Sequence, residues 1–334
     1  MAGGEIGRFG HHALVIGGPT ALDIAGEPLR RSLCDACVTH EFVVYPGYNT
    51  REAANHYAAY CKKNSFDVVV GVGGGKIMDL AKSIAHMAEL PVVNIPTQAA
   101  TCAAYTPMSV MYTEEGAAYG TVGGNFYHDY EVSAVIIDET VMIHQPPRYA
   151  ASGILDAMAK FIEVQHGHAS MPFNDFNIEL YTAYYLSKYT YDILKETCLK
   201  VYDDIREHRL TKEVHDFLFI NFALTSVISG VSKAFGQTAL AHEMYYCARM
   251  FFTNDSLSYL HGEIVGTSLI LQLYYNGTPE KIPEFRNFMK RMEMPVTLKE
   301  LGIPETGKNI AQYGICRGHR GKPGKTDELY QGCL

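Results

Sequence analysis

The sequence carries little positive charge for its size. Its 334 residues contain 28 lysines and arginines against 36 aspartates and glutamates, a formal net charge of -8. Because a nucleic-acid-binding surface needs clustered basic residues, this balance argues against a nucleic-acid partner. Long apolar runs are also missing: no window approaches the roughly 18 consecutive apolar residues of a membrane span. The N-terminal stretch lacks a basic segment followed by a long apolar core, so we expect no signal peptide. We therefore expect a cytoplasmic protein with no membrane partner.

Cysteine is too sparse for a disulfide scaffold, with eight residues in a chain of this length. Cys34 and Cys37 form one CxxC motif, in LRRSLCDACVTH. A redox motif of this kind follows a strand and opens a helix, whereas this stretch is typical of a helix that runs into a strand. A zinc ribbon needs a second CxxC, which is absent. We interpret both cysteines as residues on a helix face.

The first half of the chain alternates between short apolar runs and helical stretches. Strands separated by helices of this length indicate right-handed βαβ units and a parallel, Rossmann-like sheet. The expected strands are ALVIGG (13–18), EFVVYP (41–46), DVVVGVG (67–73), PVVNIPT (91–97), SVMYT (109–113) and SAVIID (133–138). Helices are expected between them, at about 20–37, 49–63 and 76–89.

The strand signal stops near Pro146-Pro147, a natural joint because proline removes a hydrogen-bond donor and disfavours helix before it. Most of the chain from residue 154 to residue 292 has helical spacing. The expected helices include stretches at 156–165, 176–196, 214–231, 238–251 and 263–275. The sequence therefore predicts an α/β domain over residues 1–150 and an all-α domain over residues 151–334, with an irregular tail from about residue 314.

The stretch GVGGGKIMDLAK (71–82) follows the third expected strand and opens a helix. It is not a Walker A loop, because Val70 replaces the first glycine and Ile77 replaces the serine or threonine. It is not a GxGxxG fingerprint either, because Lys76 replaces the last glycine. Successive glycines at a helix start still suit a bound phosphate, and we expect Asp79 to satisfy N–H groups in the first helical turn. The alternative is a glycine turn that packs closely under the sheet.

Five segments in order resemble the iron-containing (group III) alcohol dehydrogenases, over roughly residues 12–300. They are GVGGGKIMDLAKSIAH (71–86), PTQAATCAAYTPMSVMYT (96–113), GILDAMAKFIE (153–163), ALAHEM (239–244) and LHGEIVGTSLILQL (260–273). The branch they resemble most contains glycerol dehydrogenases and hydroxycarboxylate dehydrogenases. The resemblance implies a dehydroquinate synthase-like fold, in which a nucleotide-binding α/β domain and a helical domain hold a divalent metal ion in the cleft between them.

The resemblance also implies which residues bind a nicotinamide dinucleotide. The matching positions are Gly18, Gly74, Gly75, Lys76, Asp79, Thr97, Thr101, Thr106, Met108 and Tyr112. Gly18 falls where relatives that prefer NAD often carry an aspartate. Without that carboxylate, the 2′-phosphate of NADP is not repelled at this position. No lysine or arginine follows at once, so the sequence leaves NAD and NADP open with a lean to NADP.

Asp156, His242 and His261 match the metal ligands of the family and would form its catalytic centre. Two neutral imidazoles and one carboxylate suit a borderline divalent ion such as Zn²⁺ or Fe²⁺ and leave a position open for substrate. We expect Asp156 to begin a helix, His242 to lie within a second helix and His261 to open a third. The histidines His166 and His168 are expected to be solvated instead.

Two substrate positions depart from relatives: many members of the family carry a second histidine near the substrate, and glycerol dehydrogenases typically carry an aspartate that binds polyols. Tyr245 replaces a second histidine near the substrate, and its hydroxyl can still donate a hydrogen bond. Cys102, in AATCAAY, replaces an aspartate that binds polyols, whereas hydroxycarboxylate dehydrogenases have a similar ATCAA run. The resemblance thus implies an oxidoreductase that interconverts a small alcohol or 2-hydroxy acid with its carbonyl compound, which we expect to be a homo-oligomer.

Three alternatives remain. A dehydroquinate synthase-like lyase or a glycerol-1-phosphate dehydrogenase would bind a phosphorylated substrate and would need clustered cations near the metal. The sequence offers mainly Lys160, Lys233 and Arg249 there. A catalytically degenerate binding protein would have lost a metal ligand, and all three ligands are present. From about residue 306 the tail departs from the family, and we expect it to be solvated.

Overall fold

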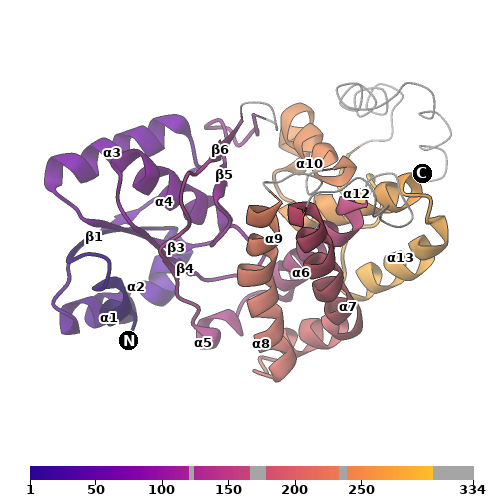
Figure 1. Ribbon diagram of the computed structural model, residues 1–334, viewed down its shortest axis with the longest axis horizontal. Coiled ribbons are helices and arrows are strands. Elements are labelled where there is room, and N and C mark those ends of the chain that lie inside the picture. Colours follow the sequence, from indigo (N-terminus) through magenta and orange to yellow (C-terminus); the bar gives the residue numbers. More distant parts are fainter. Residues whose placement is uncertain (120–123, 166–177, 233–238, 304–334) are drawn as a thin grey trace.

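The computed structural model describes residues 1–119, 124–165, 178–232 and 239–303. His166, His168, Lys233 and the tail from residue 304 lie outside the described residues. The first half of the chain forms an α/β layer, and the second half forms a group of helices beside it (Figure 1). The division into units 1–150 and 151–334 stays a prediction.

A five-stranded parallel sheet forms the centre of the α/β part, as the sequence predicts. Its strand order is β2 (Thr39–Val44), β1 (His12–Gly17), β3 (Val68–Gly73), β4 (Val92–Pro96) and β7 (Ala134–Val135). Every neighbouring pair runs parallel. The residues of β3 and β4 are buried throughout, because helices cover both faces of the sheet.

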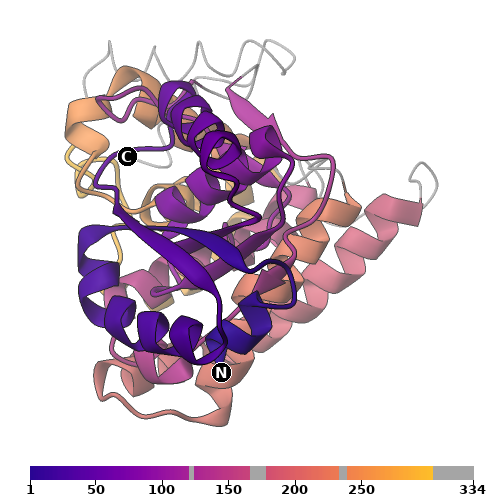
Figure 2. The same cartoon turned by 90° about the vertical axis from the view of Figure 1, so that its left-hand side faces the viewer.

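Helices lie on both faces of this sheet (Figures 1 and 2). The helices α1 (Ala2–Ile6) and α2 (Pro19–Asp35) pack on the face that carries Ala13 and Val15. The helices α3 (Arg51–Asn64) and α4 (Gly75–Ala88) pack on the opposite face, against Leu14 and Ile16. The alternation along β1 therefore divides the apolar core into two layers.

The two cysteines of the CxxC motif are exposed and free. Cys34 lies in the last turn of α2, as predicted. Cys37 lies beyond the end of that helix, with a φ of +55° in the turn that leads to β2, so its predicted place on a helix face is wrong.

The strand order creates a crevice beside β1. The chain leaves β1 to form β2 on one side of it and then returns to form β3 on the other. Parallel α/β sheets bind ligands at such a switch point, outside the carboxyl ends of the strands. Gly18 follows β1 and Gly74 follows β3 at this edge.

One expected strand leaves the main sheet. The strand β5 (Met108–Val110) pairs antiparallel with β6 (Asn125–Tyr127), and the two form a separate ribbon. This ribbon packs on α4, where Lys82 donates a hydrogen bond to the carbonyl oxygen of Met108. The short helix α5 (Glu139–Met142) then leads from the sheet to the helical part.

The helical part is built around α6 (Pro147–Val164), which is buried almost completely from Ala150 to Val164. Helices around it include α7 (Ile178–Arg206), α8 (Lys212–Phe219), η1 (Ile220–Leu224), α9 (Thr225–Val231), α10 (Leu240–Phe251), α11 (Thr253–Ser256), α12 (His261–Tyr275), η2 (Pro279–Lys281) and α13 (Ile282–Arg291). Asp156 lies in the middle of α6, so the expectation that it begins a helix is wrong. The helix begins earlier because Pro147 is favourable in a first helical turn.

The continuous helical stretch Lys212–Val231 is long and apolar enough to cross a membrane by length and composition. Half of its apolar window is buried inside the protein, and Asn221 within it donates hydrogen bonds to backbone carbonyls of the α/β part. A core helix of a folded domain has the same properties.

Candidate active site

A cleft of about 1160 Å³ lies between the carboxyl edge of the sheet and the helices α6, α10 and α12. Every residue that the sequence predicts for the site lines this cleft. These residues are Gly18, Gly74, Gly75, Lys76, Asp79, Thr97, Thr101, Cys102, Thr106, Met108, Tyr112, Asp156, His242, Tyr245 and His261. The structure therefore brings together the segments that the resemblance singled out, while the individual roles of the cofactor residues stay predictions.

The glycine turn between β3 and α4 exposes backbone to this cleft. Gly73 has a φ of +150°, which residues with a Cβ rarely adopt, and a Cβ on Gly74 would lie 2.2 Å from Nε2 of Gln98. No side chain caps α4, and the amides of Gly75 and Lys76 have no acceptor within the described part of the chain. Unpaired N–H groups at a helix start can bind a phosphate, as the sequence suggested.

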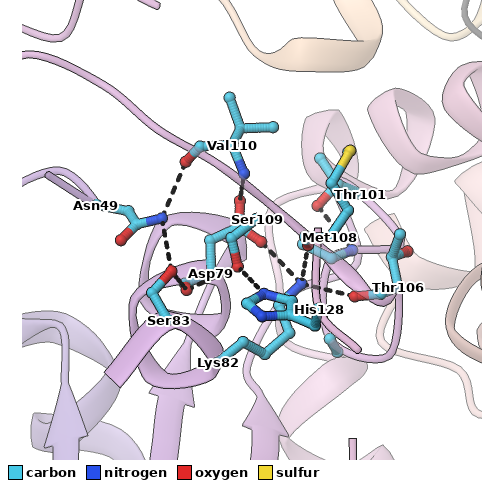
Figure 3. A network of polar contacts seen from close by, with 12 residues as sticks. Asn49, Asp79, Lys82, Ser83, Thr101, Thr106, Met108, Ser109, Val110 and His128 are labelled. Atoms are coloured by element: carbon cyan, nitrogen blue, oxygen red, sulfur yellow. Dashed lines mark hydrogen bonds and ion pairs between the residues drawn. The ribbon is translucent and has the colours of Figure 1, made fainter. Parts of the chain in front are cut away.

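Asp79 does not serve the first turn of α4. The helix begins at Gly75, so Asp79 lies in its second turn and is buried. Its carboxylate pairs with Lys82 at 2.9 Å and accepts a hydrogen bond from the amide of Val110 at 3.1 Å (Figure 3). The predicted capping role is wrong because a buried ammonium needs a partner more than an accessible helix end does.

Lys82 holds the segment that carries Thr106 and Met108, two residues predicted to bind the dinucleotide, against α4. Its Nζ donates to the carbonyl oxygens of Thr106 at 2.9 Å and of Met108 at 2.5 Å, and the close view shows this ammonium at the centre of the polar network (Figure 3). With Asp79 as its third partner, the buried charge is fully engaged. The segment that carries Thr106 and Met108 is therefore fixed by its backbone, and both residues line the cleft.

The same segment is also attached to the helical part. Ser152 on α6 donates a hydrogen bond to the carbonyl oxygen of Ala100 at 3.0 Å. Asn221 on η1 donates to the carbonyl oxygens of Ala99 and Thr101, at 3.1 and 3.2 Å. Since both halves of the chain hold these residues, the two walls of the cleft have a fixed relation to each other.

Asp156, His242 and His261 form a candidate metal centre on the helical wall. Oδ1 of Asp156 lies 3.5 Å from Nε2 of each histidine. Ligands about 2.0–2.2 Å from a tetrahedral zinc ion are about 3.4 Å apart, so this spacing fits a divalent ion. Oδ1 of Asp156 is buried and has no hydrogen-bond partner among the described residues. Within those residues, this is the one group of three or more His, Cys, Asp or Glu side chains with such proximity.

Close packing between α6 and α12 places His261 beside Asp156. A Cβ on Gly262 would lie 1.9 Å from the carbonyl oxygen of Ser152, so only glycine allows this approach. The amide of Gly262 donates a hydrogen bond to Oγ of Ser152 at 3.0 Å. The small residue after His261 therefore has a direct geometric function.

An ion pair fixes the start of α12. The carboxylate of Glu263 accepts a hydrogen bond from the amide of Leu260 at 2.7 Å, which satisfies a group at the helix start. The guanidinium of Arg148, on α6, binds both carboxylate oxygens of Glu263 at 2.6 Å. This bidentate ion pair is made by Glu263, the residue after Gly262, and limits rotation of the helical turn that carries His261.

Glu163 orients His242. Its Oε2 accepts a hydrogen bond from Nδ1 of His242, and its Oε1 accepts from the amides of Ala239 and His242 at 3.0 Å each. A proton held on Nδ1 leaves the lone pair on Nε2, which faces Asp156. Burial opposes protonation of this ring, but Glu163 and Asp156 outweigh it and raise the pKa of His242.

The remaining charges at the centre compensate one another. Burial alone would raise the pKa of Asp156, but Lys160 and the two histidines hold it well below its usual value. Burial lowers the pKa of His261. Asp156 is thus an anion and His261 a neutral ring at neutral pH, which are the states that a metal ion requires of them.

Cys102 and Tyr245 complete the wall beside the metal centre. Burial raises the pKa of the Cys102 thiol, so it is not a thiolate nucleophile at neutral pH. The ring of Tyr245 packs edge-on against His261, with centroids 4.2 Å apart. Its hydroxyl lies 2.9 Å from the hydroxyl of Tyr112, whose pKa burial raises well above the usual value.

Sequence reasoning missed Glu163 and the structural function of Lys82. Asp156, Lys160 and Glu163 follow one another at helical spacing, and all three are buried. Charged residues that share one face of an otherwise apolar helix are the signal that could have identified Glu163.

Comparison with known proteins agrees with this geometry. A family model for iron-containing alcohol dehydrogenases matches residues 1–136. The chain is 28% identical over 298 residues to glycolaldehyde reductase of Halobacterium salinarum, covering 88% of this chain and 79% of that protein. It is 27% identical over 302 residues to glycerol dehydrogenase of Thermotoga maritima, covering 90% and 79%. It is 28% identical over 236 residues to hydroxycarboxylate dehydrogenase A of Escherichia coli, covering 71% and 63%.

Solved structures share the fold. A probable glycerol dehydrogenase from Sinorhizobium meliloti superposes with a TM-score of 0.78 at 20% identity, over 97% of this chain and 87% of that one. Glycerol dehydrogenase from Schizosaccharomyces pombe gives 0.78 at 23% identity, over 97% and 80%. The predicted combination of a parallel α/β unit and a helical unit is confirmed. The chain thus contains a domain that matches the iron-containing alcohol dehydrogenase model over residues 1–136, is similar in sequence to related enzymes, and shares the fold of the solved structures.

Proposed function

We propose that the protein is a metal-dependent, NAD(P)-linked oxidoreductase that interconverts a small alcohol or 2-hydroxy acid with its carbonyl compound. The observation that carries this proposal is the single cleft that joins the open helix start at Gly74 to the cluster of Asp156, His242 and His261. The named relatives act as reductases or dehydrogenases of glycolaldehyde, glycerol and hydroxycarboxylates.

Each chain segment has a defined task in this reaction. A divalent ion bound in the cleft would supply a Lewis acid at the substrate oxygen, and a bound nicotinamide would supply the hydride acceptor or donor. Asp156, His242 and His261 would hold the ion, and Glu163 keeps the proton of His242 on Nδ1. The unpaired amides at the start of α4 would bind the dinucleotide phosphates.

The paired tyrosine hydroxyls can serve the substrate. Tyr112 and Tyr245 share one hydrogen bond, in which one hydroxyl donates and the other accepts. The accepting hydroxyl keeps its own proton, which can be donated to a substrate oxygen. Tyr245 thus has a binding function where an imidazole proton relay is absent.

We further propose that the enzyme accepts NADPH at least as well as NADH. The cleft-lining residues that follow β1 and β2 include Gly18, Pro19, Pro46 and Gly47, and none of these carries a negative charge. A 2′-phosphate is therefore not repelled there. The cytoplasmic location and the homo-oligomeric state stay predictions.

The alternatives with phosphorylated substrates find less support. Of the cations near the metal centre, Arg249 donates its hydrogen bonds to the carbonyl oxygens of Ser256 and Tyr259. Arg148 is engaged by Glu263. Lys233 lies outside the described residues. Of these cations within them, Lys160 remains, and a single cation is a weak site for a phosphate dianion.

A carbonyl-reduction screen tests the proposal. Purified full-length protein is assayed with NADH and NADPH, with and without added Zn²⁺ or Fe²⁺, against short aldehydes, hydroxyketones and 2-oxo acids. The Asp156→Ala variant should lose both bound metal and turnover, whereas Asp35→Ala, at an exposed position in α2, should lose neither. If no pairing of cofactor and metal gives turnover, and Asp156→Ala retains its metal, the proposal is wrong.

A further inference from the structure

Lys160 is a buried cation at the metal centre with no established task. It lies one helical turn after Asp156 on α6, and its side chain is 7% exposed. It lines the cleft beside His242 and Tyr245. Lysine is among the residues least often buried, so its ammonium needs compensation from its surroundings.

The ammonium of Lys160 has unused donors. The nearest carboxylate oxygen is Oδ1 of Asp156 at 3.8 Å, which is beyond hydrogen-bond distance. Within the described residues, no acceptor lies in hydrogen-bond range of its Nζ. Arg148 and Arg249, which also line the cleft, are bound by Glu263 and by backbone carbonyls.

The charges around Lys160 favour an added anion once the metal centre is filled. Asp156 and Glu163 bring two negative charges and Lys160 brings one positive charge, while Cys102 beside it is a neutral thiol. A divalent ion held by Asp156, His242 and His261 therefore leaves one net positive charge in a buried wall. A monoanion restores neutrality there, whereas a phosphate dianion leaves a net negative charge.

We propose that Lys160 binds the carboxylate of the substrate and thereby selects short 2-oxo and 2-hydroxy acids over neutral polyols. This inference rests on the proposed oxidoreductase function and narrows its substrate class. Nζ of Lys160 lies 3.8 Å from Oδ1 of the ligand Asp156, and the carboxylate of a 2-oxo acid is bonded directly to its reacting carbonyl carbon, so one small substrate can reach both the ion and the ammonium. The neutral Cys102 does not compete for the ammonium.

Pyruvate and hydroxyacetone provide the test, because they share a methyl ketone and differ in one group. Pyruvate carries a carboxylate next to the carbonyl, and hydroxyacetone carries a hydroxymethyl group there. Reduction of both is measured with the zinc-loaded full-length protein and with the Lys160→Met and Lys160→Arg variants. We expect Lys160→Met to lower kcat/KM for pyruvate about 10- to 100-fold, the loss of a charged hydrogen bond, mainly through KM. Hydroxyacetone should change less than about threefold on the same physical argument, and Lys160→Arg should recover much of the activity on pyruvate.

Binding and metal content separate the possible results. The dissociation constant of oxamate, a pyruvate isostere, is measured by calorimetry, with zinc content and thermal unfolding recorded for each variant. Lys188→Met, at an exposed position of α7 with its own aspartate partner, is the matched control. Equal losses for both substrates together with lost zinc would show that Lys160 only supports Asp156, and the inference would be wrong. The oxidoreductase proposal fails only by the separate criterion of the carbonyl screen and the Asp156→Ala variant, while an unchanged oxamate affinity in Lys160→Met, or a wild type that reduces other carbonyl compounds but not pyruvate, refutes the inference by itself.

Discussion

The substitution Glu163→Gln changes one oxygen to an NH₂ group at the partner of a metal ligand. Glu163 is fully buried, and its two oxygens accept from three donors: Nδ1 of His242 and the amides of Ala239 and His242. A glutamine has one acceptor oxygen. The better orientation places this oxygen at the two backbone amides, so the new NH₂ group faces Nδ1 of His242.

This contact reverses the tautomer of His242. An NH₂ group can only donate, so Nδ1 must accept, and the ring proton moves to Nε2. Nε2 is the atom that lies 3.5 Å from Oδ1 of Asp156. Once it carries a proton it cannot bind a metal ion, and the ring must return to the less favourable tautomer before it ligates.

The size of the expected loss in zinc affinity follows from the free-energy cost of this change of tautomer. Loss of an oriented partner of a ligating histidine typically reduces metal affinity about 10- to 100-fold, which is about 1.4–2.7 kcal/mol. We expect the zinc dissociation constant of Glu163→Gln to rise by that factor. Competition with a chromogenic chelator at pH 7.5 measures it, and the Glu196→Gln variant, at an exposed position of α7, should be unchanged.

Two results would contradict this reasoning. If Glu163→Gln binds zinc as tightly as the wild type, then Glu163 does not set the tautomer of His242. If thermal unfolding shows that the variant is not folded at the assay temperature, the main effect of Glu163 is on folding stability, through its hydrogen bonds to the amides of Ala239 and His242, and not on the tautomer of His242.

Further expected outcomes concern other contacts. Gly262→Ala should lower the free energy of unfolding in urea by about 1–3 kcal/mol, because its Cβ meets the carbonyl oxygen of Ser152. Gly4→Ala, with nothing near its added Cβ, is the control, and equal stability of the two variants would contradict the argument. Burial, with Lys82 nearby, lowers the pKa of His128 to about 3, so stability is lost as pH falls through the unfolded-state value near 6.5. Urea unfolding should show that the wild type loses about 1–2 kcal/mol more than His128→Asn between pH 7 and pH 5. Lys76→Ala should raise the dissociation constant of NADPH several-fold in fluorescence titration, since a cation at the glycine turn is removed.

The sheet was predictable because most of its strands are short apolar runs that end at or near glycine or proline. A run such as DVVVGVG is buried on both faces, which only a central parallel strand requires. The strand at Met108–Val110 has the same local pattern but pairs elsewhere. Its position depends on Lys82 and Asp79, whose need for mutual pairing arises only after α4 packs.

The metal ligands could be named from short motifs, but their supporting residues could not. Glu163 and His242 are 79 positions apart, and nothing in the local pattern around either one indicates the other. The same holds for Lys82, which binds carbonyl oxygens 24 and 26 positions away. Backbone acceptors carry no signal in the residue types, so contacts of this kind appear only with the folded chain.

The metal centre is also part of the helical core, which makes folding and ligand binding share the same contacts. Asp156, His242 and His261 belong to α6, α10 and α12, three helices that pack against one another. Oδ1 of Asp156 is buried without a hydrogen bond, a condition that costs about 1–3 kcal/mol or more in a folded protein. Apolar residues at these positions would avoid that cost, and the hydrogen bonds of Glu163 would then have no purpose. The chain has both the unpaired, buried Oδ1 of Asp156 and the hydrogen bonds of Glu163. A bound ion accounts for both, because its binding free energy offsets the cost of the unpaired oxygen.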